Sequence, residues 1–464
     1  MRDLYTRFAS AVVFPLHEAA KGHRTVAVRR ELERTQWLGR DALAEYQRRR
    51  LAHFIRDAYA RVPYVRALLD SHALTPAQVQ DLSGLRRLPL LDKAGIRANM
   101  AALKARDATG LARFNTGGSS GEPLVFFVGK ERVTHDVAAK WRATRWWGVD
   151  IGDPEIVVWG SPIELGAQDR IRALRDGLLR TRLLPAFELS AQNLARFVAQ
   201  IRDFRPRMLF GYPSSLALIA DHAEQTGMRL DDLDIRVAFV TSERLYDHQR
   251  ERIERVFGCP AANGYGGRDA GFIAHACPEG RLHITAEDMI VEIVDAAGAP
   301  VAPGQSGEIV VTHLATADFP FIRYRTGDVG TLDPEPCPCG RGLPVLGRLD
   351  GRSTDFIVAA DGTVMHGLAL IYVLRDIEQI RQFQIIQESL SFIRVRITAA
   401  GDLSPSLIEK IKAAFRQRLG ATVNVTVDTM ASIPREHSGK YRYVISKVAQ
   451  SALGASLCGD GDPA

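Results

Sequence analysis

A short segment at residues 116–123 has the composition of a phosphate-binding loop. It reads Thr-Gly-Gly-Ser-Ser-Gly-Glu-Pro, so glycines and hydroxyl side chains make up most of it. Glycines let backbone N–H groups converge on a polyphosphate, and the hydroxyls of Ser119 and Ser120, next to Gly121, donate further hydrogen bonds. The segment lacks the Walker lysine, which excludes a standard P-loop NTPase. An ordinary Ser/Gly turn is the alternative interpretation.

A second segment, residues 323–328, combines two arginines with an aspartate that follows a glycine turn. It reads Arg-Tyr-Arg-Thr-Gly-Asp. Such an aspartate can accept hydrogen bonds from two ribose hydroxyls, and the arginines can bring positive charge to a phosphate. The segment therefore predicts a nucleotide site at Asp328, with a surface salt-bridge turn as the alternative.

Three cationic side chains in the last third of the chain stand next to glycines. Arg348 and Arg352 each follow a glycine where the composition shifts between two parts of the chain, and Lys440 follows Gly439. An arginine at a hinge can touch a ligand, and a lysine on a glycine-containing loop can be a point charge that enters a site during part of a reaction cycle. Exposed turns and a solvated lysine are the alternatives.

Cys277, His283, Cys337 and Cys339 together offer three thiolates and one imidazole. Four ligands of these types are a common structural zinc set, and they leave no open coordination position for catalysis. The five cysteines of the chain are too few and too unevenly placed for a disulfide scaffold, which favours reduced thiols or a metal site. Unrelated thiols are the alternative.

The elements that must position these residues predict an α/β protein with two domains. Residues 1–100 have mostly helical periodicity, and residues 101–281 alternate apolar strands with helices, which indicates a mostly parallel sheet flanked by helices. Residues 282–349 are rich in short strands and turns, so we expect a distorted β subdomain there. The large N-terminal part thus covers 1–349, and a small α+β domain covers 350–464.

Composition and charge favour a globular protein that binds a small anionic substrate. The 464 residues are 46% hydrophobic and 25% charged, as in soluble globular proteins. The net charge of +6 and pI near 9.1 reflect arginines spread over helical stretches, which argues against nucleic acid and suits an anionic small substrate. No signal peptide and no apolar run of ~18 residues is evident, so the sequence predicts no membrane span and a cytoplasmic protein.

Taken in order, the motifs resemble those of the adenylate-forming superfamily, which includes acyl-CoA synthetases, peptide-synthetase adenylation domains and luciferases. The N-terminal pattern is similar to that of the phenylacetate-CoA ligase family at residues 31–37, 58–64 and 88–93. The resemblance covers nearly the whole chain. It implies ATP-dependent, AMP-forming activation of a small organic acid, with aryl acids favoured, followed by acyl transfer to CoA.

The resemblance also implies a role for each motif. Ser119, Ser120 and Gly121 would hold the ATP phosphates, and Asp328 the ribose. Lys440 would assist the adenylation step, in which acid attacks the α-phosphate of Mg-ATP. The part up to 349 would be the adenylation domain and the part from 350 a mobile lid that swings between the two half-reactions.

This chain departs from the family pattern at two places. The hinge motif fits residues 351–357 better than 347–350, which favours Arg352 over Arg348, but Thr354 replaces the first hinge carboxylate. Asp350 and Asp355 are both candidates for the pivot. The motif at residues 265–269 keeps Tyr265 and Gly266 but ends in Asp269 where the family usually has glutamate, and this shorter side chain could reach Mg²⁺ through a water.

Further expectations concern the metal, the acid pocket, the oligomeric state and the acyl acceptor. The Cys277, His283, Cys337 and Cys339 set resembles that of a zinc-bearing branch of the family, with zinc in a structural role. The acid pocket would draw on residues 141–147, 159–162, 211–213 and 241–243, and a homodimer is compatible with the sequence. The acyl acceptor could instead be an amine, a hydroxyl or a carrier protein. A zinc-containing nucleic-acid-binding protein is disfavoured because acidic residues surround His283.

Overall fold

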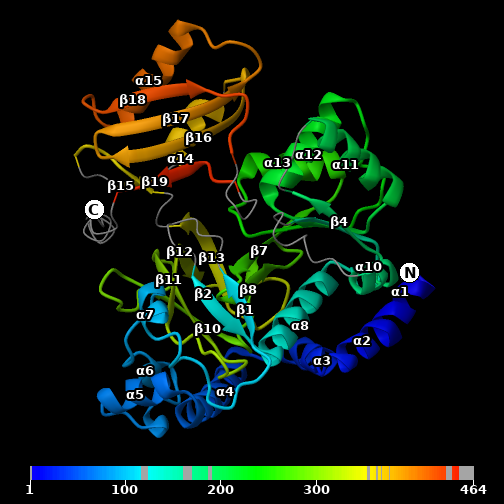
Figure 1. The fold of residues 1–464 in the computed structure, drawn as a ribbon, viewed down its shortest axis with the longest axis vertical. Coiled ribbons are helices and arrows are strands. Elements are labelled where there is room, and N and C mark those ends of the chain that lie inside the picture. Colours follow the sequence, from blue (N-terminus) through cyan, green and yellow to red (C-terminus); the bar gives the residue numbers. More distant parts are fainter. Residues whose placement is uncertain are drawn as a thin grey trace.

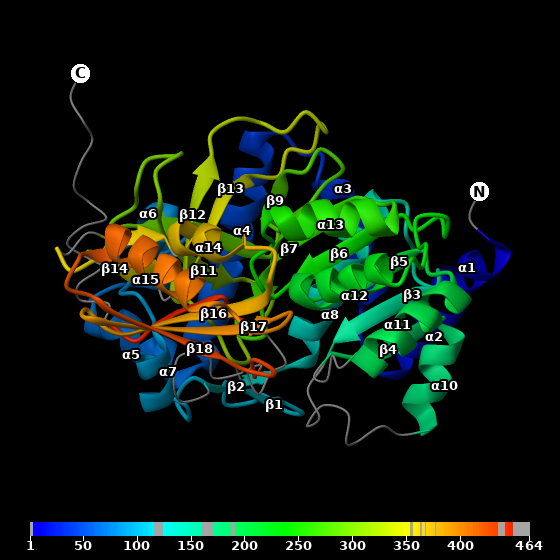
Figure 2. The same ribbon diagram turned by 90° about the horizontal axis from the view of Figure 1, so that it is seen from above.

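The computed structural model describes residues 3–115, 124–159, 170–186, 191–352, 356–361, 364–366, 368–375, 377–434 and 441–448. Within these ranges the chain forms a large N-terminal part and a smaller C-terminal domain, which lies at one end of the molecule in orange and red (Figure 1). In the view from above, the first helices of the chain, in dark blue near the label N, lie beside the green helices of the α/β region, and the C-terminal domain lies toward the opposite end of the molecule (Figure 2).

Helices dominate the first hundred described residues. Proline at position 63 divides two of them, because its fixed φ suits the first turn of a new helix and it cannot donate a hydrogen bond within the preceding one. The helical elements are α1 (Leu4–Phe8), the π-helical segment η1 (Ala9–Val13), α2 (Phe14–Ala20), α3 (Thr25–Thr35), α4 (Arg40–Arg61), α5 (Pro63–Ser71), the 3₁₀ turn η2 (Pro76–Gln78), α6 (Leu82–Leu85) and α7 (Lys93–Ala98).

An 11-stranded sheet within the described residues runs through the N-terminal part in the order β10-β11-β12-β13-β9-β8-β7-β6-β5-β3-β4. One half is parallel and consists of β3 (Glu155–Trp159), β4 (Thr181–Pro185), β5 (Met208–Gly211), β6 (Val237–Thr241) and β7 (Ala261–Gly267). The other half is antiparallel and consists of β8 (Gly271–Ala276), β9 (Leu282–Ile284), β10 (Met289–Val294), β11 (Gly307–His313), β12 (Tyr324–Asp333) and β13 (Val345–Arg352).

The parallel half has the buried strands expected of a sheet that helices cover. Every residue of β6 is buried, and β5 is buried along its whole length. The helices in this region are α8 (Lys130–Trp146), α10 (Arg170–Leu178), α11 (Ala191–Phe204), α12 (Pro213–Gln225) and α13 (Asp247–Phe257). The alternation of strands and helices predicted within residues 101–281 is therefore present, and the α/β fold class is confirmed.

The C-terminal domain has its own sheet and core. Its four-stranded sheet has the order β18-β17-β16-β19, formed by β16 (Ile380–Ser389), β17 (Phe392–Ala399), β18 (Asn424–Thr429) and β19 (Val444–Ser446). Helices α14 (Leu368–Arg375) and α15 (Pro405–Leu419) pack against it, and two small hairpins complete the described strands: β1 (Ala112–Asn115) with β2 (Val125–Val128), and β14 (Phe356–Val358) with β15 (Val364–His366). Among the described residues, no helix combines the length and apolar character needed to cross a membrane.

Candidate active site and metal centre

Asp328 lies on β12, where a tyrosine of the neighbouring motif contacts it. The Tyr265 hydroxyl donates to Asp328 Oδ2 at 2.8 Å, and lies 3.4 Å from the Thr326 hydroxyl. Burial, and then the adjacent Asp328 carboxylate, raises the pKa of Tyr265 well above its ordinary value, so the phenol stays protonated and donates. Two motifs that are about sixty residues apart in the sequence therefore meet at one carboxylate.

Asp269, on the loop between β7 and β8, also accepts a hydrogen bond from a tyrosine hydroxyl. Its Oδ2 accepts a hydrogen bond from the Tyr324 hydroxyl at 2.7 Å, and its backbone carbonyl accepts one from Arg132 Nη2 at 2.8 Å. Tyr324 and Arg132 were not assigned a role from the sequence, although Tyr324 lies inside the 323–328 motif. No sequence signal marks Arg132, because its partner is a distant backbone atom.

The register of the sheet places Arg352 beside the nucleotide motif. Asp328 and Arg352 are Cα partners across the β12–β13 pair. Gly351 has φ +97°, a conformation that other residues rarely adopt, and the pairing shifts register close to it. Arg348 lies further back on β13, where its exposed side chain pairs with Asp350 at 2.7 Å. The geometry therefore favours Arg352 over Arg348 at this edge of the sheet.

The two arginines of the 323–328 motif differ from their predicted role. Arg323 is buried and pairs with both oxygens of Glu292 at 3.1 and 3.2 Å, and Arg325 pairs with Glu308. Because a buried guanidinium must be neutralised and hydrogen-bonded, Arg323 ties β12 to β10 and to the Leu88 carbonyl. The buried Arg323 side chain is therefore not available to a phosphate.

Position 266 requires glycine for a steric reason that the sequence did not reveal. A Cβ atom at this position would lie 2.3 Å from the Gly271 carbonyl oxygen in the β7–β8 hairpin. The glycine is therefore required by the close approach of the chain to itself. Ser119, Ser120, Gly121, Lys440 and the hinge residues Thr354 and Asp355 lie outside the described residues.

The four predicted metal ligands converge. Within the described residues the donor atoms of Cys277, His283, Cys337 and Cys339 all lie within 4.8 Å of one another. The Cys277 and Cys337 sulfurs are 3.6 Å apart, close to the edge of a tetrahedron with Zn–S bonds of about 2.3 Å, which is about 3.8 Å. His283 Nε2 lies 3.2 Å from Cys339 Sγ, and its Nδ1 contacts the Leu343 carbonyl oxygen at 3.1 Å. That contact leaves Nε2 free as a metal ligand, as is usual for a ligating histidine.

This Cys/His cluster joins parts of the chain that are far apart in sequence. Cys277 and His283 flank the β8–β9 turn, whereas Cys337 and Cys339 lie between β12 and β13. The following residues dock on the N-terminal helices, since Gly342 N donates to the Gln36 carbonyl at 2.9 Å and the Arg341 guanidinium lies 5.0 Å from the Trp37 ring. The donor set and its surroundings fit a structural metal.

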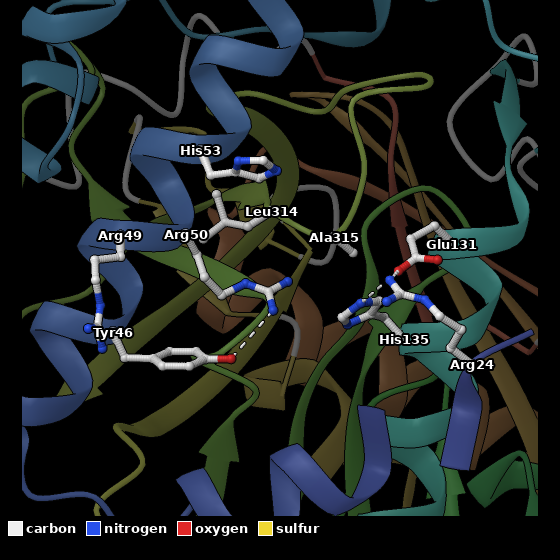
Figure 3. A pocket seen from close by; sticks show the side chains of 9 residues that line it. All are labelled: Arg24, Tyr46, Arg49, Arg50, His53, Glu131, His135, Leu314 and Ala315. Atoms are coloured by element: carbon white, nitrogen blue, oxygen red, sulfur yellow. Dashed lines mark hydrogen bonds and ion pairs between the residues drawn. The ribbon is translucent and has the colours of Figure 1, made fainter. Parts of the chain in front are cut away.

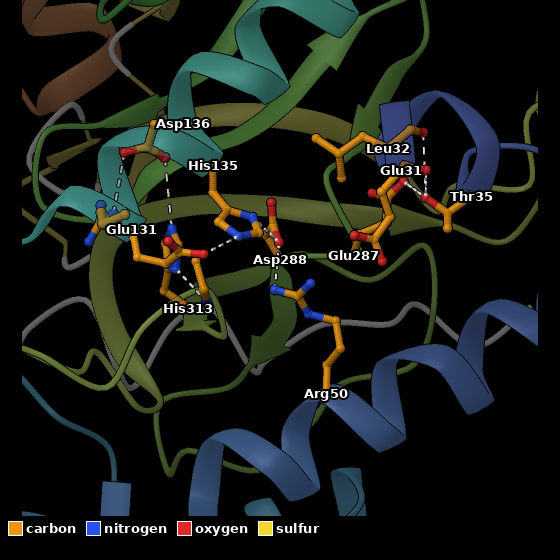
Figure 4. Close-up of polar contacts among 12 residues, drawn as sticks. Glu31, Leu32, Thr35, Arg50, Glu131, His135, Asp136, Glu287, Asp288 and His313 are labelled. Carbon is orange, nitrogen blue, oxygen red and sulfur yellow. Dashed lines mark hydrogen bonds and ion pairs between the residues drawn. The ribbon is translucent and has the colours of Figure 1, made fainter. Parts of the chain in front are cut away.

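A network of largely buried charges includes His135, Asp288 and Arg50 (Figure 4). His135 Nδ1 lies 2.8 Å from Asp288 Oδ1, and the same oxygen accepts from Arg50 Nη2 at 2.9 Å. Burial opposes a charge on His135, but the carboxylates of Asp288 and Glu131 outweigh it and raise the pKa of His135 to about 9. The network fastens α4 and α8 to the turn before β10.

The network opens into a pocket of about 360 Å³ (Figure 3). Its lining residues are Arg24, Tyr46, Arg49, Arg50, His53, Glu131, His135, Leu314 and Ala315. The arginines are paired with carboxylates: Arg24 with Glu131, Arg50 with Asp288, and Arg49 with Glu45 at 3.9 Å. None of the lining residues belongs to the nucleotide motifs, so the pocket is separate from the residues predicted to bind ATP.

His135 gives a pH dependence with a defined sign. Because its folded pKa is raised, the stabilisation that it contributes is fully present below about pH 6.5 and is lost as the pH rises through about 9. We expect the difference in thermal midpoint between the wild type and His135→Gln to shrink from pH 6.5 to pH 9.5. His53→Gln, an exposed histidine of the same pocket, is the control and should show no such trend. A difference that stays constant with pH would contradict the assignment.

Two of the aromatic residues expected near the acid belong to the core. Tyr212 is 2% exposed and stacks on Trp159 with ring centroids 4.4 Å apart, and Trp141 is 3% exposed. Trp146, Trp147 and Trp159 are partly exposed, and of these Trp159 lies at the carboxyl end of β3, the edge where ligands bind in such sheets. It is therefore the one described aromatic among these three that is placed to meet a ligand.

Two family models match separate parts of the chain. The AMP-binding enzyme family matches residues 180–317, and the CapK C-terminal domain family matches residues 357–447. The first match contains Tyr265 and Asp269, and the second begins just after β13 ends. The predicted resemblance to adenylate-forming, phenylacetate-CoA ligase-like enzymes is confirmed, and the class of protein is an AMP-forming ligase.

Individual proteins match over most of the chain. Protein CapK of Staphylococcus aureus is 23% identical over 88% of this chain and 90% of its own length. The phenylacetate-coenzyme A ligase of Thermus thermophilus is 26% identical over 88% of this chain and 97% of its own. Among solved structures, a 2-hydroxyisobutyryl-CoA ligase in its postadenylation state matches with a TM-score of 0.73, at 20% identity, over 92% of this chain and 94% of that one.

Proposed function

We propose that this protein activates a small organic acid with Mg-ATP and then transfers the acyl group to CoA. In the first half-reaction a carboxylate oxygen attacks the α-phosphorus, the bond to the β-phosphate oxygen breaks, and acyl-AMP and pyrophosphate form. In the second, the CoA sulfur attacks the acyl carbon, AMP leaves with the bridging oxygen, and the thiol proton is released. The observation that carries the proposal is the meeting of Asp328, Tyr265 and Asp269 at one edge of the sheet, in a chain with phenylacetate-CoA ligases among its relatives.

The site residues have distinct proposed roles. Asp328, oriented by Tyr265, would accept hydrogen bonds from the ribose hydroxyls, and Arg352 would approach the nucleotide from the paired strand. Asp269, oriented by Tyr324, has the oxygen chemistry that Mg²⁺ prefers and would contact it through water. Ser119, Ser120, Gly121 and Lys440 keep their predicted roles at the phosphates and at the reacting carboxylate. Arg348 keeps only a peripheral role, because its side chain pairs with Asp350.

An aryl acid is the proposed substrate class. Trp159 supports this choice because its ring is partly exposed at the ligand-binding edge of the sheet, and a relative is named for phenylacetate.

A group other than CoA is the alternative acyl acceptor. The C-terminal domain matches the CapK C-terminal domain family rather than a family named for CoA, so transfer to an amine, a hydroxyl or a carrier protein is the alternative.

The cluster of Cys277, His283, Cys337 and Cys339 is the proposed site of one structural zinc ion. Burial, and then the neighbouring sulfurs, raises the pKa of Cys337 to about 12, so a bound cation would be needed to keep its thiolate at neutral pH. Zinc at this position would link the β8–β9 turn to the loop before β13. A cytoplasmic location and a homodimer stay predictions from the sequence.

The test is acid-dependent exchange of labelled pyrophosphate into ATP. We expect exchange with at least one member of a panel of aryl and small aliphatic acids, and we expect Asp328→Asn to raise the KM for ATP by about 10-fold or more, because it removes charge-assisted hydrogen bonds to the ribose. Glu335→Gln, an exposed carboxylate on the loop before Cys337, is the matched control. AMP formation with and without CoA then separates the two acceptors. Absence of exchange together with absence of ATP binding would overturn the proposal.

A further inference from the structure

Glu243 links the two domains through its two carboxylate oxygens. Oε1 accepts a hydrogen bond from the backbone N–H of Tyr441 at 2.6 Å, and Oε2 accepts one from the backbone N–H of Ser214 at 3.2 Å. Tyr441 belongs to the C-terminal domain and Ser214 to the α/β region, and Tyr441 directly follows Lys440. One side chain therefore bridges the residue after the predicted catalytic lysine and the body of the enzyme.

The α/β region fixes Glu243 firmly. Ser214 is the second residue of α12, so its N–H is one of the helix donors without an intrahelical partner, and the positive end of the helix dipole favours a carboxylate there. The preceding residue, Ser242, has φ +71°, a conformation that a non-glycine residue keeps only when its surroundings hold it. Such local strain is typical of residues whose position serves a function.

Contacts with β16 hold residues 441–443 in place within the C-terminal domain. Tyr441 is 8% exposed, and its hydroxyl donates to the Phe383 carbonyl on β16, while the Tyr443 carbonyl accepts from Ile385 N at 2.7 Å. The Tyr443 ring meets Tyr246 edge-on, with centroids 5.2 Å apart, and also His248 at 6.1 Å. Residues 243–249 of one domain thus form a polar and aromatic platform for residues 441–443 of the other.

We infer that Glu243 is a positioning residue that docks the C-terminal domain in the arrangement used for adenylation. This inference rests on the proposed function. The hydrogen bond to Tyr441 N fixes the described residue that directly follows Lys440 in the sequence. We therefore expect adenylation, the step assigned to Lys440, to require the contact between Glu243 and Tyr441. The domain movement to the second half-reaction must break this contact.

Measuring the half-reactions separately tests the inference. Glu243→Gln keeps the shape of the side chain but removes its charge, so we expect the kcat of ATP–pyrophosphate exchange to fall by about 10- to 100-fold, with the KM for ATP and acid nearly unchanged. Thioester formation from supplied acyl-adenylate should stay within about twofold of the wild type, and Glu251→Gln, an exposed carboxylate on α13, should match the wild type in both assays. An equal loss in both half-reactions would overturn the inference, because it would indicate general damage.

Hydrogen exchange gives a second readout that does not depend on activity. In the full-length wild type, the Tyr441 amide should be protected, and Glu243→Ala should speed its exchange by about 10-fold while amides of the β16–β17 pair stay unchanged. Unchanged protection at Tyr441 would overturn the inference even if activity falls. If the wild type shows no pyrophosphate exchange with any acid but the Tyr441 amide responds to Glu243, then the proposed function fails and the docking role of Glu243 stands.

Discussion

Lys440→Ala is expected to lower acid-dependent ATP–pyrophosphate exchange by about 10²- to 10³-fold. In the first half-reaction negative charge develops between the attacking carboxylate and the α-phosphate, and a positioned ammonium group stabilises it in a site that excludes water. Removing one such preorganised group from an enzyme typically costs about 2.7–4 kcal/mol of transition-state stabilisation, which corresponds to this loss of rate. The measurement is initial exchange velocity at saturating ATP and acid.

The same variant should leave the rate of the second half-reaction nearly unchanged. When acyl-adenylate is supplied, thioester formation by Lys440→Ala should lie within about threefold of the wild type, because the lysine acts only during adenylation. Lys447→Ala is the matched control, since Lys447 is an exposed lysine seven residues further on that pairs with Glu388. Full exchange activity in Lys440→Ala would remove the lysine from the mechanism, and an equal loss in both half-reactions would point to misfolding.

Loss of the metal cluster is expected to have the largest effect on stability. The protein purified without added metal should contain about one zinc ion per chain, and Cys337→Ser should contain about a tenth of that or less. Structural zinc contributes its binding free energy directly to folding, with apparent values of about 10–16 kcal/mol in small zinc-finger peptides. We therefore expect the thermal midpoint of Cys337→Ser to fall by about 10 °C or more.

Cys259→Ser is the control for this experiment. Cys259 is a buried cysteine that packs in the α/β core and does not belong to the cluster of ligands. Its replacement should leave the zinc content at about one ion per chain, although the changed core packing will lower the midpoint somewhat. Equal metal content in Cys337→Ser and Cys259→Ser would contradict the zinc site, and a zinc-free wild type with a normal midpoint would do so as well.

The ion pair between Arg323 and Glu292 is a feature of the predicted nucleotide motif that the sequence did not reveal. The 323–328 motif predicts a ribose-binding role for Asp328, because an aspartate after a glycine turn is a local pattern that the sequence states directly. The same motif suggested that Arg323 meets a phosphate, yet this side chain is buried against Glu292, 31 residues away. Charge and residue type do not reveal whether a guanidinium faces a ligand or a buried carboxylate, since that depends on how strands pack.

Local patterns were enough to predict the α/β class of the fold and to group the four Cys and His side chains that the structure brings together. The alternation of apolar strands with helices predicted for residues 101–281 is observed, as in β6 followed by α13 and β7, and the short strands predicted for residues 282–349 include β10 and β11. The four ligands could be grouped because thiolates and imidazoles are rare and share a chemistry. Such features depend on a few neighbouring residues or on residue type, which the sequence states directly.

Only the tertiary structure decided which distant residues meet. Arg352 lies across from Asp328 because a positive φ at Gly351 and shifts of strand register set the pairing, and a shift of one residue would turn each side chain to the other face. Glu243 meets Tyr441 across 198 positions only because the two domains dock. Spacing along the chain carries no information about such contacts, since they result from the packing of whole elements. The sequence by itself thus determined the class of chemistry, and the fold determined which residues can perform it.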